Sequence, residues 1–366
     1  MNPTFQRLMN EATLLTRSGQ LQAATDMIQR ALRGDDSAVA TPTPPAAPSA
    51  PTRNAAVVID VPARVVPDAP AEPRADAERN PQPERPEQWT DGSFTHQGRT
   101  LAYKLYLPQR PAEAPAMPLV LMLHGCTQNP DDFAAGTQMN ALARELGVAV
   151  LYPAQTQRAN AQGCWNWFKP QHQQRGRGEP AVLAALTQSV MAQHGIDPAR
   201  VYVAGLSAGG AMADILGRCY PDLFAGVGVH SGLPADAASD VMSAMSAMRS
   251  GPATQGAHAK GMPPLIVFHG DADATVSARN GDAVVAAALG HGNAAPQTTQ
   301  GVSSKGQRFT RRVHPAAGER ATVEHWQLHG AGHAWSGGSS RGSFTDPRGA
   351  DASAEMLRFF LAHPRR

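Results

Sequence analysis

The stretch that decides the fold is residues 201–216, which read VYVAGLSAGGAMADIL. Its first four residues are apolar, as in a buried strand, and the segment 210–216 has the pattern of a helix. A G-x-S-x-G pentapeptide between a strand and a helix is typical of a nucleophile elbow, a sharp turn that projects a serine hydroxyl from the carboxyl edge of a sheet. The glycines are needed because a Cβ there would collide with the neighbouring strand or helix. We therefore predict that Ser207 is a nucleophile.

Beyond residue 89, short apolar runs alternate with longer helical patterns. The runs that predict strands are 119–123, 148–152, 201–204, 226–229, 265–268 and 322–328, after a hairpin over 93–107. The patterns that predict helices are 132–145, 180–194, 208–218, 279–289 and 352–363. Strands separated by helices of this length form a mostly parallel sheet with helices on both faces. The predicted fold class is therefore α/β, with the reactive side chains at the carboxyl ends of the strands.

A serine nucleophile needs a base to take its proton and a third group to orient that base. In α/β-hydrolases these partners follow the serine in the order Asp or Glu, then His. The loop after strand 265–268 carries Asp273, predicted to orient the base, and Asp271, whose alternative role is to cap the turn. After the last strand, His333 lies in a glycine-flanked loop and is the predicted base, whereas His329 is expected to belong to the strand.

The tetrahedral intermediate of such a reaction needs two N–H donors aimed at its oxyanion. The backbone of Ala208, which follows Ser207 at a helix N-terminus, is predicted to supply one of them. The backbone of Cys126, in the H-G-x position of the loop after strand 119–123, is predicted to supply the other. His124 is the first residue of the same H-G-x motif. The alternative to a functional role for it is that of a turn residue whose ring pins the loop.

Aromatic residues in or near these loops predict an apolar mouth of the site. We expect Trp165 and Trp335 to line this mouth and to contact an apolar acyl chain or a flat ring of the substrate. Trp167 and Phe168 are further candidates for this lining. The alternative is that two of these four aromatic residues belong to the core instead.

Composition and motifs argue against several function classes. A net charge of +2 gives no support for a nucleic-acid-binding face. The chain has no H-E-x-x-H, no paired-cysteine spacing and no Gly-Lys dipeptide, so we expect no metal and no cofactor. Residues 1–33 lack the apolar core of a signal peptide, and no stretch approaches the roughly 18 apolar residues of a membrane span. A cytoplasmic protein that does not span a membrane is therefore expected.

Three cysteines are too few for a disulfide framework, and whether Cys126 and Cys164 pair is open.

Three regions are predicted along the chain. Residues 1–33 form a helical hairpin with a break at Gly19, which is either a solvated appendage or an adhesion element. Residues 34–88, rich in Pro and Ala, form a disordered linker, and residues 89–366 form the catalytic domain.

Several motifs agree in order with one known family. They are Leu123-His124-Gly125-Cys126-Thr127-Gln128, Cys164-Trp165-Asn166-Trp167-Phe168, Gly205-Leu206-Ser207-Ala208-Gly209-Gly210, His269-Gly270 with Asp273, and Gly332-His333-Ala334-Trp335. From about Phe94 to Leu361 the chain resembles the esterase/polyhydroxybutyrate depolymerase family of the α/β-hydrolase superfamily, which also contains feruloyl and acetylxylan esterases. The resemblance implies Ser207, Asp273 and His333 as a catalytic triad and Cys126 as an oxyanion donor.

The predicted function is a serine esterase that hydrolyses hydroxyalkanoate polyester or oligoester through an acyl-enzyme. Its expected partner is the ester substrate, with the surface of a polyester granule as a second one. One alternative is a feruloyl or acetyl-ester carboxylesterase that acts on small esters. These two differ in their use for residues 1–33, because an apolar hairpin on a spacer serves a granule-bound enzyme. An alternative of another class is a granule-associated protein without turnover.

Overall fold

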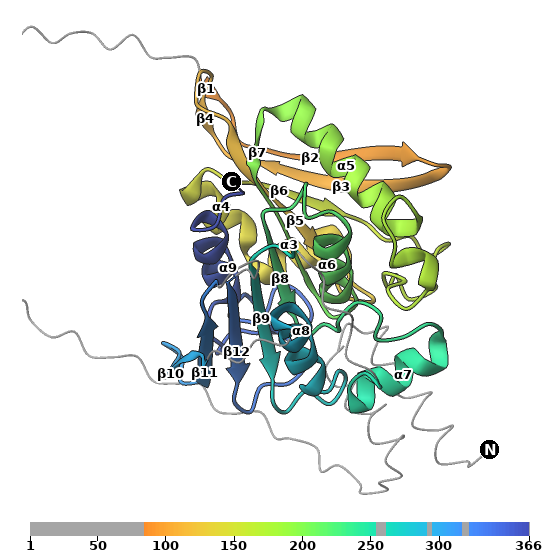
Figure 1. Ribbon diagram of the computed structural model, residues 1–366. Coiled ribbons are helices and arrows are strands. Elements are labelled where there is room, and N and C mark those ends of the chain that lie inside the picture. Colours follow the sequence, from red (N-terminus) through yellow and green to blue (C-terminus); the bar gives the residue numbers. More distant parts are fainter. Residues whose placement is uncertain (1–83, 254–260, 291–294, 317–321, 366) are drawn as a thin grey trace, which may run out of the picture. The chain divides into compact units, whose positions relative to one another are not determined.

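The computed structural model describes residues 84–253, 261–290, 295–316 and 322–365. Within these ranges a ten-stranded sheet has the order β10-β11-β12-β9-β8-β7-β5-β6-β3-β2 (Figure 1). Its strands are β2 (Gln88–His96), β3 (Arg99–Leu107), β5 (Met117–Leu123), β6 (Ala149–Pro153), β7 (Ile196–Leu206), β8 (Gly226–His230), β9 (Leu265–Gly270), β10 (Gln297–Val302), β11 (Arg308–His314) and β12 (Val323–Leu328). Two short pairs are β1 (Glu84–Arg85) with β4 (Arg110–Pro111), and β13 (Trp335–Ser336) with β14 (Thr345–Asp346).

The centre of the sheet is parallel and its two margins are antiparallel. Strands β6, β5, β7, β8, β9 and β12 run parallel to one another, while β2 and β3 flank them on one side and β10 and β11 on the other in antiparallel pairing. Because the central strands are parallel, their carboxyl ends share one edge of the sheet. The loops that follow β5, β7, β8, β9 and β12 all begin at this edge, where α/β folds place their reactive groups.

Helices cover both faces of the sheet. They are α3 (Pro130–Thr137), α4 (Met139–Leu146), the 3-10 helix η1 (Pro170–His172), α5 (Gly178–His194), α6 (Ala208–Cys219), α7 (Val241–Ser250), α8 (Arg279–Leu289) and α9 (Ala352–Leu361). Side chains of β5 alternate between the faces: Leu119, Leu121 and Leu123 pack with α5, α6 and α8, and Val120 and Met122 pack with α3, α4 and α9. This is the predicted architecture of an α/β-hydrolase.

Several boundaries differ from the predictions. The predicted helix 132–145 is two helices, because Gln138 has a φ of 54° and ends α3 before α4 begins. Helix α7 and the β10–β11 hairpin were not predicted, and β10 is mostly polar and exposed, so it lacks the apolar run of a buried strand. Residues 84–88, assigned to the linker, include β1 and the first residue of β2.

The predicted hairpin 1–33 and the linker up to residue 83 lie outside the described residues. No helix in the described ranges is long and apolar enough to cross a membrane.

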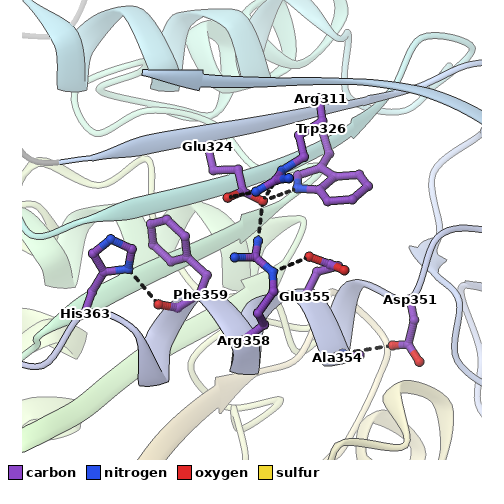
Figure 2. A network of polar contacts seen from close by, with 9 residues as sticks. All are labelled: Arg311, Glu324, Trp326, Asp351, Ala354, Glu355, Arg358, Phe359 and His363. Carbon is purple, nitrogen blue, oxygen red and sulfur yellow. Dashed lines mark hydrogen bonds and ion pairs between the residues drawn. The ribbon is translucent and has the colours of Figure 1, made fainter. Parts of the chain in front are cut away.

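A buried carboxylate fastens α9 to the sheet (Figure 2). Glu324 of β12 accepts hydrogen bonds from Arg311 Nε over 2.8 Å, from Trp326 Nε1 over 2.7 Å and from Arg358 Nη2 of α9 over 2.6 Å. Burial alone raises the pKa of the Glu324 carboxyl, but the hydrogen bonds from Arg311 and Trp326 and the charge of Arg358 bring the pKa below its usual value. Helix α9 is therefore held to the sheet by the Glu324 carboxylate, whose charge is paired with Arg311 and Arg358.

Candidate active site

Ser207 lies in the turn between β7 and α6, with a φ of 57° in the left-handed region. A Cβ on Gly205 would come within 2.4 Å of the backbone of Gly209, and a Cβ on Gly209 within 2.0 Å of the carbonyl oxygen of Leu123. Only glycine fits at both positions. The backbone N–H of Ser207 donates to the carbonyl of His230 over 2.9 Å. The turn therefore has the geometry of a nucleophile elbow, at the carboxyl end of β7.

His333 and Asp273 come from the loops after β12 and β9, and Nδ1 of the imidazole lies 2.7 Å from Oδ2 of the carboxylate. The other carboxylate oxygen accepts the backbone N–H groups of Thr275 and Val276 over 2.9 and 2.8 Å. Burial raises the pKa of the Asp273 carboxyl, but the hydrogen bond and charge of His333 bring the pKa below its usual value. Of the two tautomers of an uncharged imidazole, an ionised carboxylate beside Nδ1 favours the one with the proton on Nδ1 and the lone pair on Nε2.

Asp271 belongs to a different pair. Its Oδ2 lies 2.8 Å from Nδ1 of His329, and its Oδ1 accepts the backbone N–H of Gly330 over 2.7 Å. The other ring nitrogen of His329 lies 2.8 Å from the hydroxyl of Thr310 on β11. Asp271 therefore closes the turn after β12, and the structure brings Asp273 rather than Asp271 to His333.

His230, the last residue of β8, joins the serine turn to the histidine loop and was missed in the sequence. Its carbonyl accepts the N–H of Ser207, and its Nε2 accepts the backbone N–H of Ser336 over 2.9 Å, three residues after His333. Complete burial, helped by the charges of neighbouring histidines, lowers the pKa of His230 to about 3. The neutral ring is therefore a permanent acceptor. The available signal was a histidine that ends a strand at the reactive edge.

The loop that carries Cys126 lies against the serine turn. A Cβ on Gly125 would be 3.7 Å from Cβ of Ser207. The N–H of Gly125 donates to Oε1 of Gln128 over 2.9 Å, which holds the loop in shape. Ala208 is the first residue of α6, and N–H groups in a first helical turn have no intrahelical acceptor. The backbones of the two predicted oxyanion donors thus belong to segments that meet at Ser207.

Cys126 and Cys164 form a disulfide, which answers the question that the sequence left open. The bond ties the loop of Cys126 to the tryptophan-containing segment that follows Cys164. A backbone hydrogen bond from Thr127 to Gln162 over 2.7 Å links the same loop to the residues just before Cys164. Cys219 is a free thiol, and burial raises its pKa to about 11, so it is a poor nucleophile at neutral pH.

A buried carboxylate, that of Glu179, holds several segments of the same region together through hydrogen bonds. Glu179 in the first turn of α5 accepts hydrogen bonds from Gln155 Nε2 over 2.7 Å and from the backbone and side-chain nitrogens of Asn166 over 2.7 and 2.6 Å. Burial raises the pKa of Glu179, but its contacts with His172 and Asn166 bring the pKa below its usual value. The backbone of Gln155 donates to Nε2 of His124 over 3.1 Å. His124 therefore pins its loop, the alternative considered for it.

The expectation that Trp165 and Trp335 line the mouth of the site is corrected by their burial. Both side chains are 0% exposed. The indole N–H of Trp165 donates to the carbonyl of His124, and that of Trp335 donates to the hydroxyl of Ser353, each over 3.1 Å. A buried indole with a satisfied N–H is a core residue. These two rings support the loops of the candidate site and cannot contact a substrate in this structure.

Known proteins similar to this chain include polyester depolymerases. The chain is 34% identical over 251 residues to poly(3-hydroxyalkanoate) depolymerase C of Paucimonas lemoignei, and the alignment covers 65% of this chain. It spans only 59% of the length of that relative. Acetylxylan esterase A of Talaromyces purpureogenus is 29% identical over 199 residues, which cover 50% of each protein. Feruloyl esterase B of Neurospora crassa is 30% identical over 35% of this chain and 42% of its own length.

Among solved structures, the acetyl xylan esterase from Aspergillus awamori superposes with a TM-score of 0.55 at 20% identity, over 67% of this chain and 94% of that one. This likeness supports the fold. The family model described as "Esterase PHB depolymerase" matches residues 101–300, more than half of the chain. The protein therefore belongs to the esterase PHB depolymerase family.

Proposed function

We propose that this protein is a serine esterase that cleaves hydroxyalkanoate polyester or oligoester through an acyl-enzyme. The observation that carries the proposal is the hydrogen bond between His333 and Asp273, at the sheet edge where the Ser207 turn lies. A serine hydroxyl becomes a good nucleophile when an imidazole takes its proton and a buried carboxylate orients that imidazole. The depolymerase relative with 34% identity supports the polyester as substrate class.

In the proposed reaction, Oγ of Ser207 attacks the carbonyl carbon of the ester while Nε2 of His333 takes the hydroxyl proton. Asp273 stabilises the imidazolium, and the N–H groups of Ala208 and Cys126 stabilise the oxyanion. His333 then gives its proton to the leaving alcohol oxygen, which leaves an acyl group on the serine. Water repeats these steps on the acyl-enzyme and releases the hydroxy acid with regeneration of the free serine.

A second candidate is an esterase that acts on small acetyl or feruloyl esters. The acetylxylan and feruloyl esterase relatives support it. Measurement of kcat/KM on hydroxybutyrate oligomers, amorphous polyhydroxybutyrate granules, p-nitrophenyl butyrate and methyl ferulate separates the two candidates. Preference for the oligomers and granules supports the polyester, and preference for methyl ferulate supports the small-ester enzyme.

The test of the nucleophile is Ser207→Ala, which should lower kcat on every hydrolysed ester by about 10³-fold or more. The matched control is Ser239→Ala, an exposed serine that should change nothing. Retention of more than about a tenth of the wild-type kcat in Ser207→Ala would contradict the assignment. A fluorophosphonate probe that fails to label the wild-type serine would favour the granule-associated protein without turnover.

We place the protein in the cytoplasm, on polyester granules, as part of the same proposal. The Cys126–Cys164 disulfide is the observation against this location, because disulfides persist in oxidising compartments. Thiol trapping in intact cells tests the point: a reduced pair in a granule fraction supports the cytoplasm, and a fully oxidised pair contradicts it. Co-sedimentation with granules, compared for the full chain and a variant lacking residues 1–33, tests the adhesion role of that segment.

A further inference from the structure

Phe344 is an exposed aromatic side chain beside the proposed catalytic histidine. Its ring centroid lies 6.5 Å from that of His333, with the ring planes 76° apart. The side chain is 46% exposed, unlike the two buried tryptophans that the sequence offered as a lining. Because nearly half of this side chain meets solvent, its ring is free to contact an ester bound beside His333.

The backbone at Phe344 is strained. Its φ is 51°, a region that bulky side chains rarely adopt and that glycine adopts freely. Its carbonyl accepts the backbone N–H of Trp335 over 2.7 Å, at the start of the β13–β14 pair. Strained conformations that surrounding contacts enforce are concentrated at functional sites. A glycine would fit this backbone better, and the chain nevertheless has an aromatic ring there.

Two polar contacts, one exposed and one half-buried, hold the preceding residue, Ser343, in place. Its backbone N–H donates to Oδ1 of Asp132 over 2.8 Å, and its carbonyl accepts Nε2 of Gln128 over 3.0 Å. Oε1 of Gln128 also accepts the N–H of Gly125, in the loop of residues 124–128 that carries the proposed donor Cys126 and that we call the oxyanion loop. One glutamine therefore positions the oxyanion loop and the segment that presents Phe344.

The chemistry of the proposed reaction decides which part of the ester reaches this ring. The imidazole that protonates the leaving oxygen must approach it to hydrogen-bond distance, about 2.6–3.2 Å. The carbons of the leaving alcohol therefore lie beside His333, where the Phe344 ring also lies. We propose that Phe344 binds the apolar carbons of the leaving alcohol and determines which alcohol groups the enzyme accepts. The inference rests on the proposed function.

In a hydroxyalkanoate chain, the leaving alcohol is the remainder of the chain, and its carbinol carbon carries an alkyl side group. An aromatic face next to that carbon favours such a branched, apolar alcohol over a small or charged one, because contact with the ring removes apolar surface from water.

Two ester series separate the alcohol side from the acyl side. In methyl, butyl, hexyl and benzyl acetate only the alcohol changes, and in p-nitrophenyl acetate, butyrate and octanoate only the acyl chain changes. For Phe344→Ala, kcat/KM should stay within about twofold of wild type on methyl acetate and fall about tenfold on hexyl and benzyl acetate. Along the p-nitrophenyl series the loss should be one constant factor. Phe344→Leu should recover most of the loss on hexyl acetate.

Two further variants separate binding from folding. Phe344→Gly suits the positive φ, so its Tm should equal or exceed that of wild type while its alcohol selectivity falls as in Phe344→Ala. Trp89→Ala removes an aromatic that is 38% exposed on β2, the outermost strand, and should leave the selectivity unchanged. An equal loss on methyl and hexyl acetate, or a loss that grows with acyl length, overturns the proposal. A wild type that hydrolyses neither these esters nor hydroxybutyrate oligomers overturns the proposed function with it, whereas an active wild type with an unchanged Phe344→Ala profile overturns this inference alone.

Discussion

The Oδ2 atom of Asp273 lies 2.7 Å from Nδ1 of His333, although the two residues are 60 positions apart in the chain. The carboxylate is buried and ionised, so it selects the tautomer in which Nε2 faces away with its lone pair. This contact has one counterpart in the same two loops, the pair of Asp271 and His329, which is partly exposed.

Asp273→Asn should lower kcat by about 10³–10⁴-fold, because an amide that donates to Nδ1 stabilises the wrong tautomer of His333. Asp271→Asn should leave kcat within about threefold and cost at most about 1 kcal/mol of stability, because its pair with His329 is partly exposed. Steady-state kinetics of the two variants on one soluble ester check the ranking. If Asp271→Asn is the more damaging change, the orienting carboxylate is misassigned.

Histidines held neutral by burial should make the protein sensitive to acid. Burial lowers the pKa of His230 to about 3, whereas a histidine in an unfolded chain titrates near about 6.5. Between these values the unfolded state binds the extra proton, so stability falls as the pH falls from about 6.5 towards 3, by up to about 1.4 kcal/mol per pH unit from this group. Denaturant unfolding at several pH values measures this slope.

The His230→Gln variant should show a flatter slope over the same window. His325→Gln should have the same effect, because burial and the charge of Arg312 lower the pKa of His325 to about 3 as well. Above about pH 7.5 these histidines are neutral in both states, so the variants and the wild type should run parallel there. An unchanged slope below pH 6.5 in His230→Gln would show that the acid sensitivity has another source.

The disulfide should contribute both stability and activity. The two cysteines are 38 positions apart in the chain. A bond that closes a loop of this length stabilises the folded state by about 4 kcal/mol, because it restricts the unfolded chain. Reduction with dithiothreitol should therefore lower the free energy of unfolding by several kcal/mol and lower kcat by about tenfold, because Cys126 carries a proposed oxyanion donor. A Cys126→Ser, Cys164→Ser double variant should resemble the reduced protein and no longer respond to dithiothreitol.

The matched control for this experiment is Cys219→Ser, which removes the free thiol. This variant should keep the full response to dithiothreitol. A wild type whose unfolding and kcat are the same with and without reductant would contradict the prediction.

Glu179→Gln should affect both folding and turnover. The amide presents a donor where the carboxylate accepted N–H groups of Gln155 and Asn166, so the loss of stability should be about 1–3 kcal/mol. Because the network reaches His124 in the oxyanion loop, we expect kcat to fall more than KM changes. Glu145→Gln, at an exposed position of α4, is the control and should change neither quantity. A KM effect without a kcat effect would contradict this positioning role.

Glu324→Gln should destabilise the fold without affecting chemistry. The variant leaves Arg311 without a charged partner and Arg358 with Glu355 alone, and should cost about 1–3 kcal/mol in denaturant unfolding. Glu355→Gln, in which an exposed pair with Arg358 is lost, should cost less than about 1 kcal/mol. A change in kcat of the folded protein upon Glu324→Gln would show that α9 communicates with the active site.

The parts of this protein that the sequence predicted are those with a local physical cause. The central strands are buried on both faces, so they read as continuous apolar runs whatever packs on them. The elbow was visible because Gly205 and Gly209 meet backbone at distances that admit no Cβ. Strand ends of a parallel sheet share an edge, so the order of Ser207, Asp273 and His333 was enough to predict their placement.

The parts that only the tertiary structure decided depend on neighbours from distant segments. Trp165 and Trp335 lie in or near the loops of the candidate site, and only the packed loops show that both rings are buried and that Phe344, beside His333, is exposed. The roles of His230 and Glu179 arise from hydrogen bonds to the loops after other strands. The identity of a residue does not tell how much of its side chain is covered by residues from distant segments. The sequence by itself therefore determined the fold and which residues are proposed to react, whereas the packing of loops from separate strands decided what surrounds and supports those residues.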